Sequence, residues 1–503
     1  MILDKRHIGF RWSIFLYRPS VNFTRPILDT SKTTYDRLIA ELPFKPTTGQ
    51  QGFIYQLSDF LTEKNVGKVF LLRGYAGTGK TSMVISVVKT LKAMNRKYAL
   101  LAPTGRAAKV LAAYTRQRAF TIHKFIYQIT TDEFGGIRFA LRHNRGKNAV
   151  IIVDEASMIS LARDAGSGRI QSKNLLSDLM KFMEEGKDCK LILIGDTAQL
   201  PPVGSVDSPA LDGKVLQTNF HFEPKMQHEL REVVRQEADS GILTNATELR
   251  NLLAEGRSDI ALKINFPDIK VIDMLDLEDE LNSAYSNYGE DNAMVITRSN
   301  KSANQFNNQI RIRIKYMEDE IASTDKLMVV KNNYYWLPKG SGAGFIANGD
   351  MIEIMRLGTV EEMFGFRFAN ATIRLMDYPE EDSLDVKLLL NSLHVESAAL
   401  PDADYEQLYN AVCLSYAHIP TPSEQAKKIA EDPYLHALQI KFGYAITCHK
   451  AQGGQWPAVF VDQGYLTAEM LGTEYVRWLY TAITRASEKL YLVNFNEQFL
   501  SSD

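Results

Sequence analysis

The chain has 503 residues, of which 45% are hydrophobic and 23% charged, and its formal net charge is −2. This length allows two to four domains, and the near-neutral charge excludes a global basic field for nucleic acid but not a local basic groove. No apolar run reaches the roughly 20 residues that span a bilayer. Cys189, Cys413 and Cys448 match no metal-ligand spacing, so we expect reduced thiols in a cytoplasmic protein without a membrane segment.

Residues 1–44 are predicted to form an N-terminal extension or a loosely docked arm. Basic residues precede a short apolar stretch, as in a targeting segment, but Arg18 interrupts it and no small-residue cleavage site follows. Gln50 follows this extension and comes just before a helical pattern that carries Phe53, Ile54 and Leu57. Because a Gln amide offers one donor and one acceptor, Gln50 is a candidate for reading an adenine if a nucleotide site follows.

Residues 69–81 read Val-Phe-Leu-Leu-Arg-Gly-Tyr-Ala-Gly-Thr-Gly-Lys-Thr and contain the pattern G-x-x-x-x-G-K-[ST]. A strand-like run precedes the pattern and apolar residues at helical spacing follow it, which favours a phosphate-binding loop over a chance glycine-rich turn. The loop N–H groups and the helix N-terminus would surround the phosphates of ATP, with the lysine on the β- and γ-phosphates and the threonine on Mg²⁺. The predicted nucleotide-binding residues are Gly74, Gly77, Thr78, Gly79, Lys80, Thr81 and Ser82.

From this loop to about residue 228, strands alternate with helices and carry polar residues at their carboxyl ends, which predicts an open parallel α/β sheet. Residues 127–148 differ from this pattern. There, Phe134-Gly135-Gly136 is flanked on both sides by β-forming residues. This predicts a projecting β-hairpin with its turn near Gly135.

Two strand ends carry candidate catalytic residues. Asp154 and Glu155 follow a buried apolar strand, where Asp154 can hold Mg²⁺ through a water and Glu155 can polarise the attacking water. Gln199 follows another strand and can sense the γ-phosphate. The alternative for Gln199 is a purely structural turn fixed by Pro201 and Pro202, and both interpretations are compatible.

A second α/β pattern begins after Leu230, and it contains Arg235 and Arg485. Arginine stabilises charge on a transferred phosphoryl group because its planar fork bonds two oxygens. For either arginine alone, a surface ion pair is the competing interpretation. If both belong to a second lobe, that lobe closes over ATP and couples hydrolysis to domain motion.

These features, in this order, resemble the motifs of superfamily 1 helicases over residues 46–492. The motifs are Gln50, residues 74–81, Asp154-Glu155-Ala156-Ser157, Gly195-Asp196-Thr197-Ala198-Gln199, Arg235-Gln236, residues 443–454 and residues 480–485. Ala102-Pro103-Thr104-Gly105-Arg106-Ala107-Ala108-Lys109 and Thr121-Ile122-His123 are similar to the RecD/Dda branch, which runs 5′→3′ on single-stranded DNA.

The resemblance implies an α/β fold class with two RecA-like parallel-sheet domains, ATP and Mg²⁺ in the cleft between them, a β-hairpin insertion in the first domain and a small β-barrel-like insertion in the second. The domains expected on this basis are 1A at residues 45–126 and 149–228, hairpin 1B at 127–148, 2A at 229–330 and 437–503, and insertion 2B at 331–436. Residues 390–436 are more helical than a barrel requires. The resemblance also assigns Arg235 and Arg485 as arginine fingers and adds Gly453 to the nucleotide-binding residues.

Single strands are held by backbone contacts and base stacking with little sequence reading. The DNA-contacting residues implied by the motifs are Pro103, Thr104, Arg106, Thr121, His123, Thr297, Arg298, Asn300, Thr447, His449 and Lys450, with Phe134 (or Ile137 or Phe139) as the wedge that stacks on the terminal base pair. Buried histidines with satisfied hydrogen bonds are the alternative for His123 and His449.

We therefore expect an ATP-dependent DNA helicase that translocates 5′→3′ as a monomer and unwinds duplexes from single-strand/double-strand junctions, in DNA repair, recombination or replication. The expected catalytic residues are Lys80, Asp154, Glu155, Gln199, Arg235 and Arg485, with Thr81 and Asp154 at the metal. A translocase that remodels protein–DNA complexes and an RNA helicase share these motifs and stay open. A non-motor nucleotide-binding regulator would not need Gln199 and both arginines.

Overall fold

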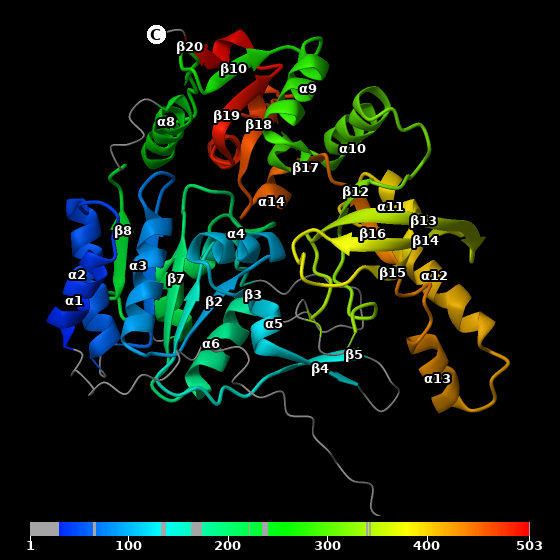
Figure 1. Cartoon of the computed structure of the whole chain (residues 1–503), viewed down its shortest axis with the longest axis horizontal. Coiled ribbons are helices and arrows are strands. Elements are labelled where there is room, and N and C mark those ends of the chain that lie inside the picture. Colours follow the sequence, from blue (N-terminus) through cyan, green and yellow to red (C-terminus); the bar gives the residue numbers. More distant parts are fainter. Residues whose placement is uncertain are drawn as a thin grey trace, which may run out of the picture.

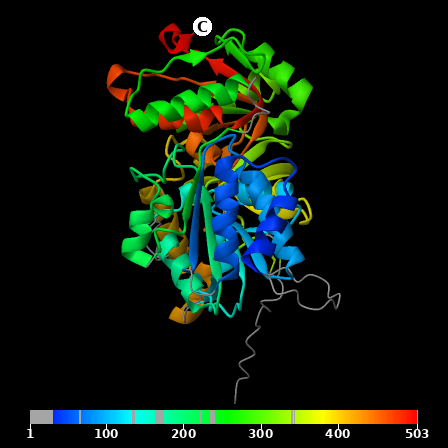
Figure 2. The same cartoon turned by 90° about the vertical axis from the view of Figure 1, so that its left-hand side faces the viewer.

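The computed structural model describes residues 30–63, 67–131, 137–161, 174–220, 222–233, 240–338, 341 and 344–501. Within these residues the chain forms two parallel sheets, a closed barrel and a hairpin (Figure 1). Figure 2 shows the second sheet above the first, with the first domain in the lower half of the view. No helix in these ranges is both long enough and apolar enough to cross a membrane.

The first domain is built on a six-stranded sheet in the order β3-β2-β6-β7-β1-β8, and every pairing in it is parallel. Its strands are β1 (Val69–Gly74), β2 (Tyr98–Ala102), β3 (Ala119–Thr121), β6 (Val150–Val153), β7 (Lys190–Gly195) and β8 (Gln227–Leu230). The central strands are near-continuous apolar runs because both faces of a parallel sheet are covered. Neighbouring β6, β7 and β1 therefore bring the residues that follow them to one edge.

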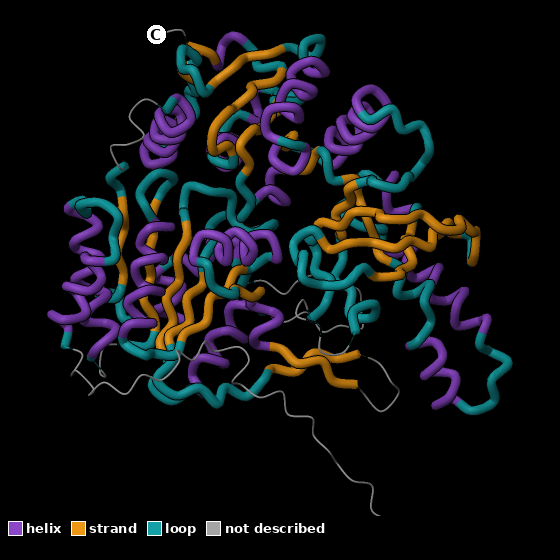
Figure 3. Tube along the Cα trace, viewed as in Figure 1, coloured by secondary structure: helices purple, strands orange, loops and turns teal. Residues whose placement is uncertain are grey.

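Helices cover both faces of this sheet, and Figure 3 shows them in purple around the orange strands. They are α1 (Ser31–Ala40), α2 (Thr48–Thr62), α3 (Lys80–Ala93), α4 (Gly105–Thr115), α5 (Ile122–Ile126), α6 (Leu175–Glu185) and α7 (Gly213–Phe220). Helix α1 packs into the first core through Leu38, whose carbonyl accepts a hydrogen bond of 2.6 Å from the Ser86 hydroxyl. The expected extension at residues 1–44 thus includes a helix that belongs to the first domain's core.

A β-hairpin leaves this domain between α5 and β6. It consists of β4 (Tyr127–Thr131) paired with β5 (Ile137–Leu141). Two contacts anchor its base: the Tyr127 hydroxyl donates to Asp178 at 2.7 Å, and Arg142 Nε donates to the Tyr127 carbonyl at 2.6 Å. The predicted turn, including Phe134, lies outside the described residues, as do the side chains of Ile137 and Phe139.

The second domain contains a five-stranded parallel sheet in the order β10-β19-β18-β11-β17. Its strands are β10 (Ile269–Ile272), β11 (Ala293–Thr297), β17 (Ala445–Thr447), β18 (Trp456–Asp462) and β19 (Ala486–Val493), with the short pair β9 (Leu262–Lys263) and β20 (Leu500–Ser501) beside it. Its helices are α8 (Gly241–Glu255), α9 (Leu277–Tyr288), α10 (Asn300–Gln309), α14 (Cys448–Ala451) and α15 (Thr473–Ile483).

A closed barrel is inserted between β11 and β17. Its strands are β12 (Lys326–Val329), β13 (Met351–Met363), β14 (Phe366–Leu375), β15 (Leu384–Leu389) and β16 (Leu438–Phe442). Strand β12 closes the barrel because it pairs with both β13 and β16, so the first and last barrel strands lie just outside the expected range 331–436. Two residues, Gly443 and Tyr444, separate β16 from β17 of the second sheet.

The helical part of the insertion lies outside the barrel wall. It consists of α11 (Asn391–His394), α12 (Asp402–Ser415) and α13 (Pro422–Ala430). Figure 1 shows the last two of these helices, α12 and α13, at the lower right. Leu408 and Val412 of α12 pack on Phe366 and Phe368 of β14 in a separate small core. The parallel sheets, hairpin and barrel confirm the fold class expected from the sequence.

Candidate active site

The phosphate-binding loop joins β1 to α3 and is shaped by glycines. Gly77 (φ 72°) and Gly79 (φ 82°) adopt left-handed conformations that residues with a Cβ rarely tolerate. A Cβ on Gly74 would lie 2.9 Å from Thr78 Oγ1, which itself donates to the Tyr75 carbonyl at 2.8 Å. The loop is therefore a tight cradle whose N–H groups converge at the start of α3.

Lys80 lies across this cradle. Its Nζ donates to the carbonyls of Gly74 at 2.7 Å and Tyr75 at 2.8 Å, and lies 3.9 Å from Asp196 Oδ2. Thr81 follows it with an exposed side chain. An ammonium bonded to loop carbonyls and an exposed hydroxyl thus follow each other in the chain at the start of α3, where phosphate oxygens and a hard cation would bind.

Asp154 and Glu155 sit at the end of β6, next to β7 and one strand away from β1. Asp154 Oδ1 accepts the Glu155 N–H at 2.9 Å, and the Tyr114 hydroxyl donates to Oδ2. Glu155 has a left-handed backbone (φ 53°). Burial raises the pKa of the Glu155 carboxyl above its usual range, and the charge of nearby Arg485 opposes that rise.

The segment after β7 belongs to the first domain and forms hydrogen bonds with the second domain. Asp196 accepts the Ala198 N–H at 2.9 Å and the Tyr480 hydroxyl at 2.6 Å. Gln199 is only 4% exposed, and its Oε1 has no hydrogen-bond partner among the described residues. A buried acceptor without a partner is costly, so its presence beside the phosphate-binding loop fits a site that takes a ligand.

Helix α15 of the second domain reaches the first domain directly. The Tyr480 hydroxyl accepts the N–H of Ala76 in the phosphate-binding loop at 2.9 Å, and the Thr481 hydroxyl accepts the N–H of Leu200 at 2.8 Å. Arg485 is 3% exposed and donates to carbonyls of its own domain at 3.0 and 3.1 Å, while its charge acts on Glu155. Arg235 lies outside the described residues.

Two predicted nucleotide contacts have other partners. Gln50 Nε2 donates to the Thr78 carbonyl at 3.0 Å, and its Oε1 accepts the Thr47 N–H at 3.1 Å in the capping box of α2. The Gln50 side-chain amide therefore holds the phosphate-binding loop, and its oxygen is already bonded to the backbone of its own helix start. A Cβ on Gly453 would lie 2.6 Å from the Cβ of Ala107, so Gly453 packs on α4 rather than on the loop.

Three further residues belong to this site, and the sequence alone does not predict their roles. Tyr114 contacts Asp154, Tyr480 bridges Ala76 and Asp196, and the Arg250 guanidinium of α8 lies 4.8 Å from the centre of the Tyr75 ring. Tyr480 opens the motif at residues 480–485, so its membership of that motif is a signal in the sequence. Tyr114 and Arg250 lie on helices whose orientation no local pattern reveals.

The predicted DNA contacts of the first domain gather around the starts of α4 and α5. The Thr104 and Thr121 hydroxyls accept the N–H groups of Ala107 and Lys124, each at 3.2 Å, and so cap these helices. The Arg106 guanidinium lies 4.6 Å from the centre of the Trp456 ring of the second domain. Pro103 and His123 are half-buried.

The predicted DNA contacts of the second domain differ in accessibility. Thr297 is fully buried and its hydroxyl donates to the Ser299 carbonyl at 3.0 Å, which leaves its side chain no surface for a strand. Arg298 lies over the Tyr475 ring at 5.6 Å. Lys450 donates to the Asn348 side chain of the barrel insertion, and burial lowers the pKa of its ammonium to about 8. The remaining three, Asn300, Thr447 and His449, are half-buried at helix starts.

The barrel insertion also covers the start of α4. Asp350 lies so close that a Cβ on Gly105 would be 2.1 Å from its Oδ1, and this oxygen has no hydrogen-bond partner among the described residues. Burial, with help from the charge of Asp377, raises the pKa of the Asp350 carboxyl to about 8. The other charged or titratable groups near it are Lys124, Arg106 and Tyr378.

We predict that Asp350→Asn makes the protein's stability less dependent on pH. A carboxyl whose pKa rises from 3.8 to about 8 on folding binds more protons when folded, so its contribution to stability falls as pH rises between these values. Asparagine is neutral throughout. Between pH 6 and pH 9 the Tm of the unaltered protein should therefore fall more than that of Asp350→Asn. The exposed carboxylate Asp385 on β15 provides the control Asp385→Asn, which should follow the unaltered protein.

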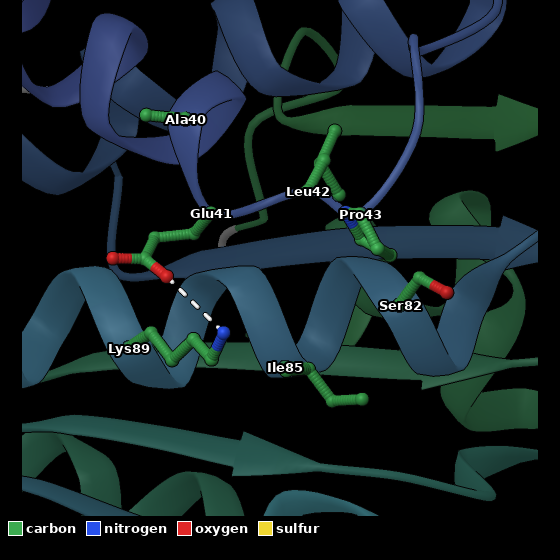
Figure 4. A pocket seen from close by; sticks show the side chains of 7 residues that line it. All are labelled: Ala40, Glu41, Leu42, Pro43, Ser82, Ile85 and Lys89. Atoms are coloured by element: carbon green, nitrogen blue, oxygen red, sulfur yellow. Dashed lines mark ion pairs between the residues drawn. The ribbon is translucent and has the colours of Figure 1, made fainter.

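A pocket of about 250 Å³ lies between α3 and the segment that links α1 to α2 (Figure 4). It is lined by Ala40, Glu41, Leu42, Pro43, Ser82, Ile85 and Lys89. Glu41 and Lys89 form an ion pair of 3.2 Å at one side of it. Because Ser82 belongs to the predicted phosphate-binding residues, the pocket adjoins the start of α3.

Comparison with known proteins gives matches in both domains. Residues 58–265 match the family described as AAA domain, and residues 442–493 match the UvrD-like helicase C-terminal domain. The uncharacterized protein R530 of Acanthamoeba polyphaga mimivirus is 25% identical over 88% of this chain and 98% of its own length. The ATP-dependent RecD2 DNA helicase of Deinococcus radiodurans is 29% identical over 31% of this chain and 19% of its own length.

The ATP-dependent DNA helicase dda of Enterobacteria phage T4 is 31% identical over 36% of this chain and 37% of its own length. This chain thus spans well under half of both helicases. Among solved structures, the Pif1 helicase from Bacteroides in complex with ADP-AlF3 and ssDNA covers 91% of this chain at 14% identity, with a TM-score of 0.45.

A phosphate-binding loop, an acidic pair at the same edge of the sheet and a second parallel-sheet domain in contact with both define the class of two-domain P-loop nucleotide-binding proteins. The matches to a helicase C-terminal domain, to RecD2 and to dda agree with this class. Over these parts the chain is similar to superfamily 1 helicases, among them RecD2 and dda.

Proposed function

We propose that this protein is an ATP-dependent DNA helicase that moves 5′→3′ along single-stranded DNA. The observation that carries the proposal is the direct contact between the phosphate-binding loop of one domain and α15 of the other. Tyr480 bonds both the Ala76 N–H and Asp196, and Arg485 acts on Glu155 across the same cleft. A nucleotide in this cleft touches both domains, so its hydrolysis changes how they are held together.

The chain's own residues divide the hydrolytic work. Thr81 and Asp154 supply the oxygen ligands that Mg²⁺ prefers, and Mg²⁺ neutralises charge on the phosphates when bound. Lys80 exchanges its carbonyl partners for phosphate oxygens, and Glu155 orients and polarises the attacking water. Gln199 gains a partner for its unpaired oxygen. Arg485, together with Arg235, stabilises the charge that develops on the transferred group.

The pocket in Figure 4 is where we place the nucleotide base. Ser82 lines this pocket and immediately follows Thr81 of the phosphate-binding loop, so a nucleotide with its phosphates at Lys80 extends toward it. Leu42, Pro43 and Ile85 offer apolar surface to the faces of a base. Gln50 supports this arrangement from behind, by holding the loop through the Thr78 carbonyl.

The single strand is expected to cross the carboxyl edge of both sheets, where the starts of α4, α5 and α14 lie. Proteins grip single strands with positive groups and stacking surfaces, and Arg106, Arg298 and Lys450 are among the positive groups at this edge. We assign the first sheet to domain 1A and its hairpin to 1B. The second sheet corresponds to domain 2A, and the barrel insertion corresponds to 2B.

Two measurements test the proposal. ATP turnover is measured with single-stranded DNA, with RNA and with neither, and we expect stimulation by DNA. Duplexes with a 5′ or a 3′ overhang are then presented with ATP and Mg²⁺, and we expect strand separation from the 5′ overhang. Stimulation by RNA alone would overturn the DNA assignment. Unwinding from the 3′ overhang alone would overturn the direction.

We predict that the hairpin separates the strands and is dispensable for ATP turnover. A variant in which a short Gly-Ser linker replaces residues 128–141 keeps both anchors, Tyr127 and Arg142. It should lose unwinding by at least about tenfold, because about 1.4 kcal/mol of stacking per base-pair step is no longer offset by a wedge. Its turnover on single-stranded DNA should stay within twofold of normal. If strands still separate at the normal rate, the wedge lies elsewhere.

A translocase that displaces proteins from DNA is the second candidate, and the assay with 5′ and 3′ overhangs distinguishes it from a helicase. The unaltered protein would then hydrolyse ATP on single-stranded DNA without separating strands from either overhang.

A further inference from the structure

The carboxylate of Asp154 is held at both of its oxygens. Oδ1 accepts the backbone N–H of Glu155 at 2.9 Å, and Oδ2 accepts the hydroxyl of Tyr114 from α4. The Tyr114 ring packs against the core of the first domain. A hydrogen bond from a hydroxyl to an ionised carboxylate is among the strong ones, so Tyr114 fixes the direction in which Asp154 presents its remaining lone pairs.

The same helix is touched from outside the first domain, at its other end. A Cβ on Gly453 of the second domain would lie 2.6 Å from the Cβ of Ala107, and one on Gly454 would lie 2.8 Å from Cδ of Arg106. In the barrel insertion, Asp377 pairs with Lys109 at 3.2 Å. Helix α4 is therefore in direct contact with both the second domain and the barrel insertion.

Helix α4 is short and stiff, and it lies across the upper end of the first sheet in Figure 1. From Gly105 to Tyr114 it spans roughly 14 Å at 1.5 Å per residue. Its first two turns therefore meet the second domain and the barrel, and its last turn meets the metal-binding carboxylate. A shift of the second domain against Ala107 moves the Tyr114 hydroxyl relative to Asp154 without any intervening flexible segment.

We propose that Tyr114 is a positioning residue for the magnesium-binding carboxylate Asp154, and that α4 transmits the placement of the second domain to it. This inference rests on the proposed function, since it takes Asp154 to be the residue that holds Mg²⁺ beside the nucleotide. Partners of this kind, which orient a metal-binding group without touching the metal, change metal affinity by about 10- to 100-fold when removed.

The first experiment removes the hydroxyl and keeps the ring. Binding of a fluorescent ADP is titrated in EDTA and in Mg²⁺ for the unaltered protein and for Tyr114→Phe. In EDTA the two should bind equally within twofold. The gain in affinity that Mg²⁺ provides should fall about tenfold in Tyr114→Phe. Tyr98→Phe is the matched control, because its hydroxyl bonds Gln117 at 3.1 Å in the same domain, and its Mg²⁺ gain should be normal.

An unchanged Mg²⁺ gain in Tyr114→Phe would overturn the positioning role, and so would an increased one, because the hydroxyl would then compete with the ion. Equal losses with and without Mg²⁺ would also overturn it, since they would indicate a general effect on the fold.

The second experiment tests transmission along α4. Gly453→Ala places a methyl group against Ala107, and it should lower the Mg²⁺ gain by on the order of threefold on its own. In the Tyr114→Phe background the same change should have no further effect on the Mg²⁺ gain. If the two effects multiply, the second domain does not act through Tyr114 and the transmission is refuted.

Both experiments use equilibrium binding and need no turnover. Absence of any nucleotide binding by the unaltered protein would end the proposed function itself. Normal Mg²⁺-dependent binding by both the unaltered protein and Tyr114→Phe would end the present inference alone.

Discussion

Lys80→Ala is expected to abolish ATP turnover, with or without DNA. The Lys80 ammonium is the cation that lies across the phosphate-binding loop, bonded to the Gly74 and Tyr75 carbonyls and 3.9 Å from Asp196. Removing a preorganised donor to a developing anion costs roughly 10²- to 10³-fold in rate, and loss of phosphate binding adds to this. The measurement is steady-state phosphate release at saturating single-stranded DNA.

The control for this variant lies on the same helix. Lys92→Ala removes a lysine from the last turn of α3, more than two turns from the loop, and should hydrolyse ATP normally. Should Lys80→Ala keep a tenth or more of the normal rate, the loop would not be the catalytic phosphate site.

Glu155→Gln is expected to bind ATP and fail to hydrolyse it. Glu155 is half-buried beside Asp154 at the end of β6, where the charge of Arg485 acts on it. The amide keeps the shape of the side chain while losing the negative charge that polarises water. General-base removal lowers turnover by roughly 10²- to 10⁴-fold. Nucleotide affinity, followed with fluorescent ATP in Mg²⁺, should stay within a few-fold of normal.

The matched change is Glu184→Gln, at an exposed glutamate near the end of α6. It should leave turnover intact. Normal turnover by Glu155→Gln would refute its role with water, and loss of nucleotide binding would indicate that this carboxylate supports the site instead.

The phosphate-binding loop and the carboxylates at strand ends could be predicted from local sequence, because their chemistry depends on residues that are neighbours in the chain. Gly77, Gly79 and Lys80 act within one turn, and an apolar run before Asp154 is enough to predict a buried strand. Those predictions needed no tertiary information. The alternation of strands and helices likewise predicted the parallel sheets that the structure contains.

Residues whose partners are distant in the chain were harder to predict. Gln50 has the position of a base-reading glutamine, yet its acceptor is used by the Thr47 N–H and its donor by the Thr78 carbonyl. Gly453 stands in a helicase motif but meets Ala107 across the domain interface. Tyr114 forms a contact 40 residues away in the chain. Such choices depend on how helices lie on the sheet, which periodicity does not specify.

The short connection from the barrel to the second sheet has a mechanical consequence. Gly443 and Tyr444 alone separate β16 from β17, and Tyr444 is pinned by Asn307 through its N–H and by Asp325 through its hydroxyl, each at 3.0 Å. We therefore expect the barrel and the second sheet to move as one rigid unit. If the cleft opens during ATP turnover, as the proposed function requires, the barrel moves away from α4 together with the second sheet. The Asp377–Lys109 ion pair and the Asp350–Gly105 contact are then broken in every cycle.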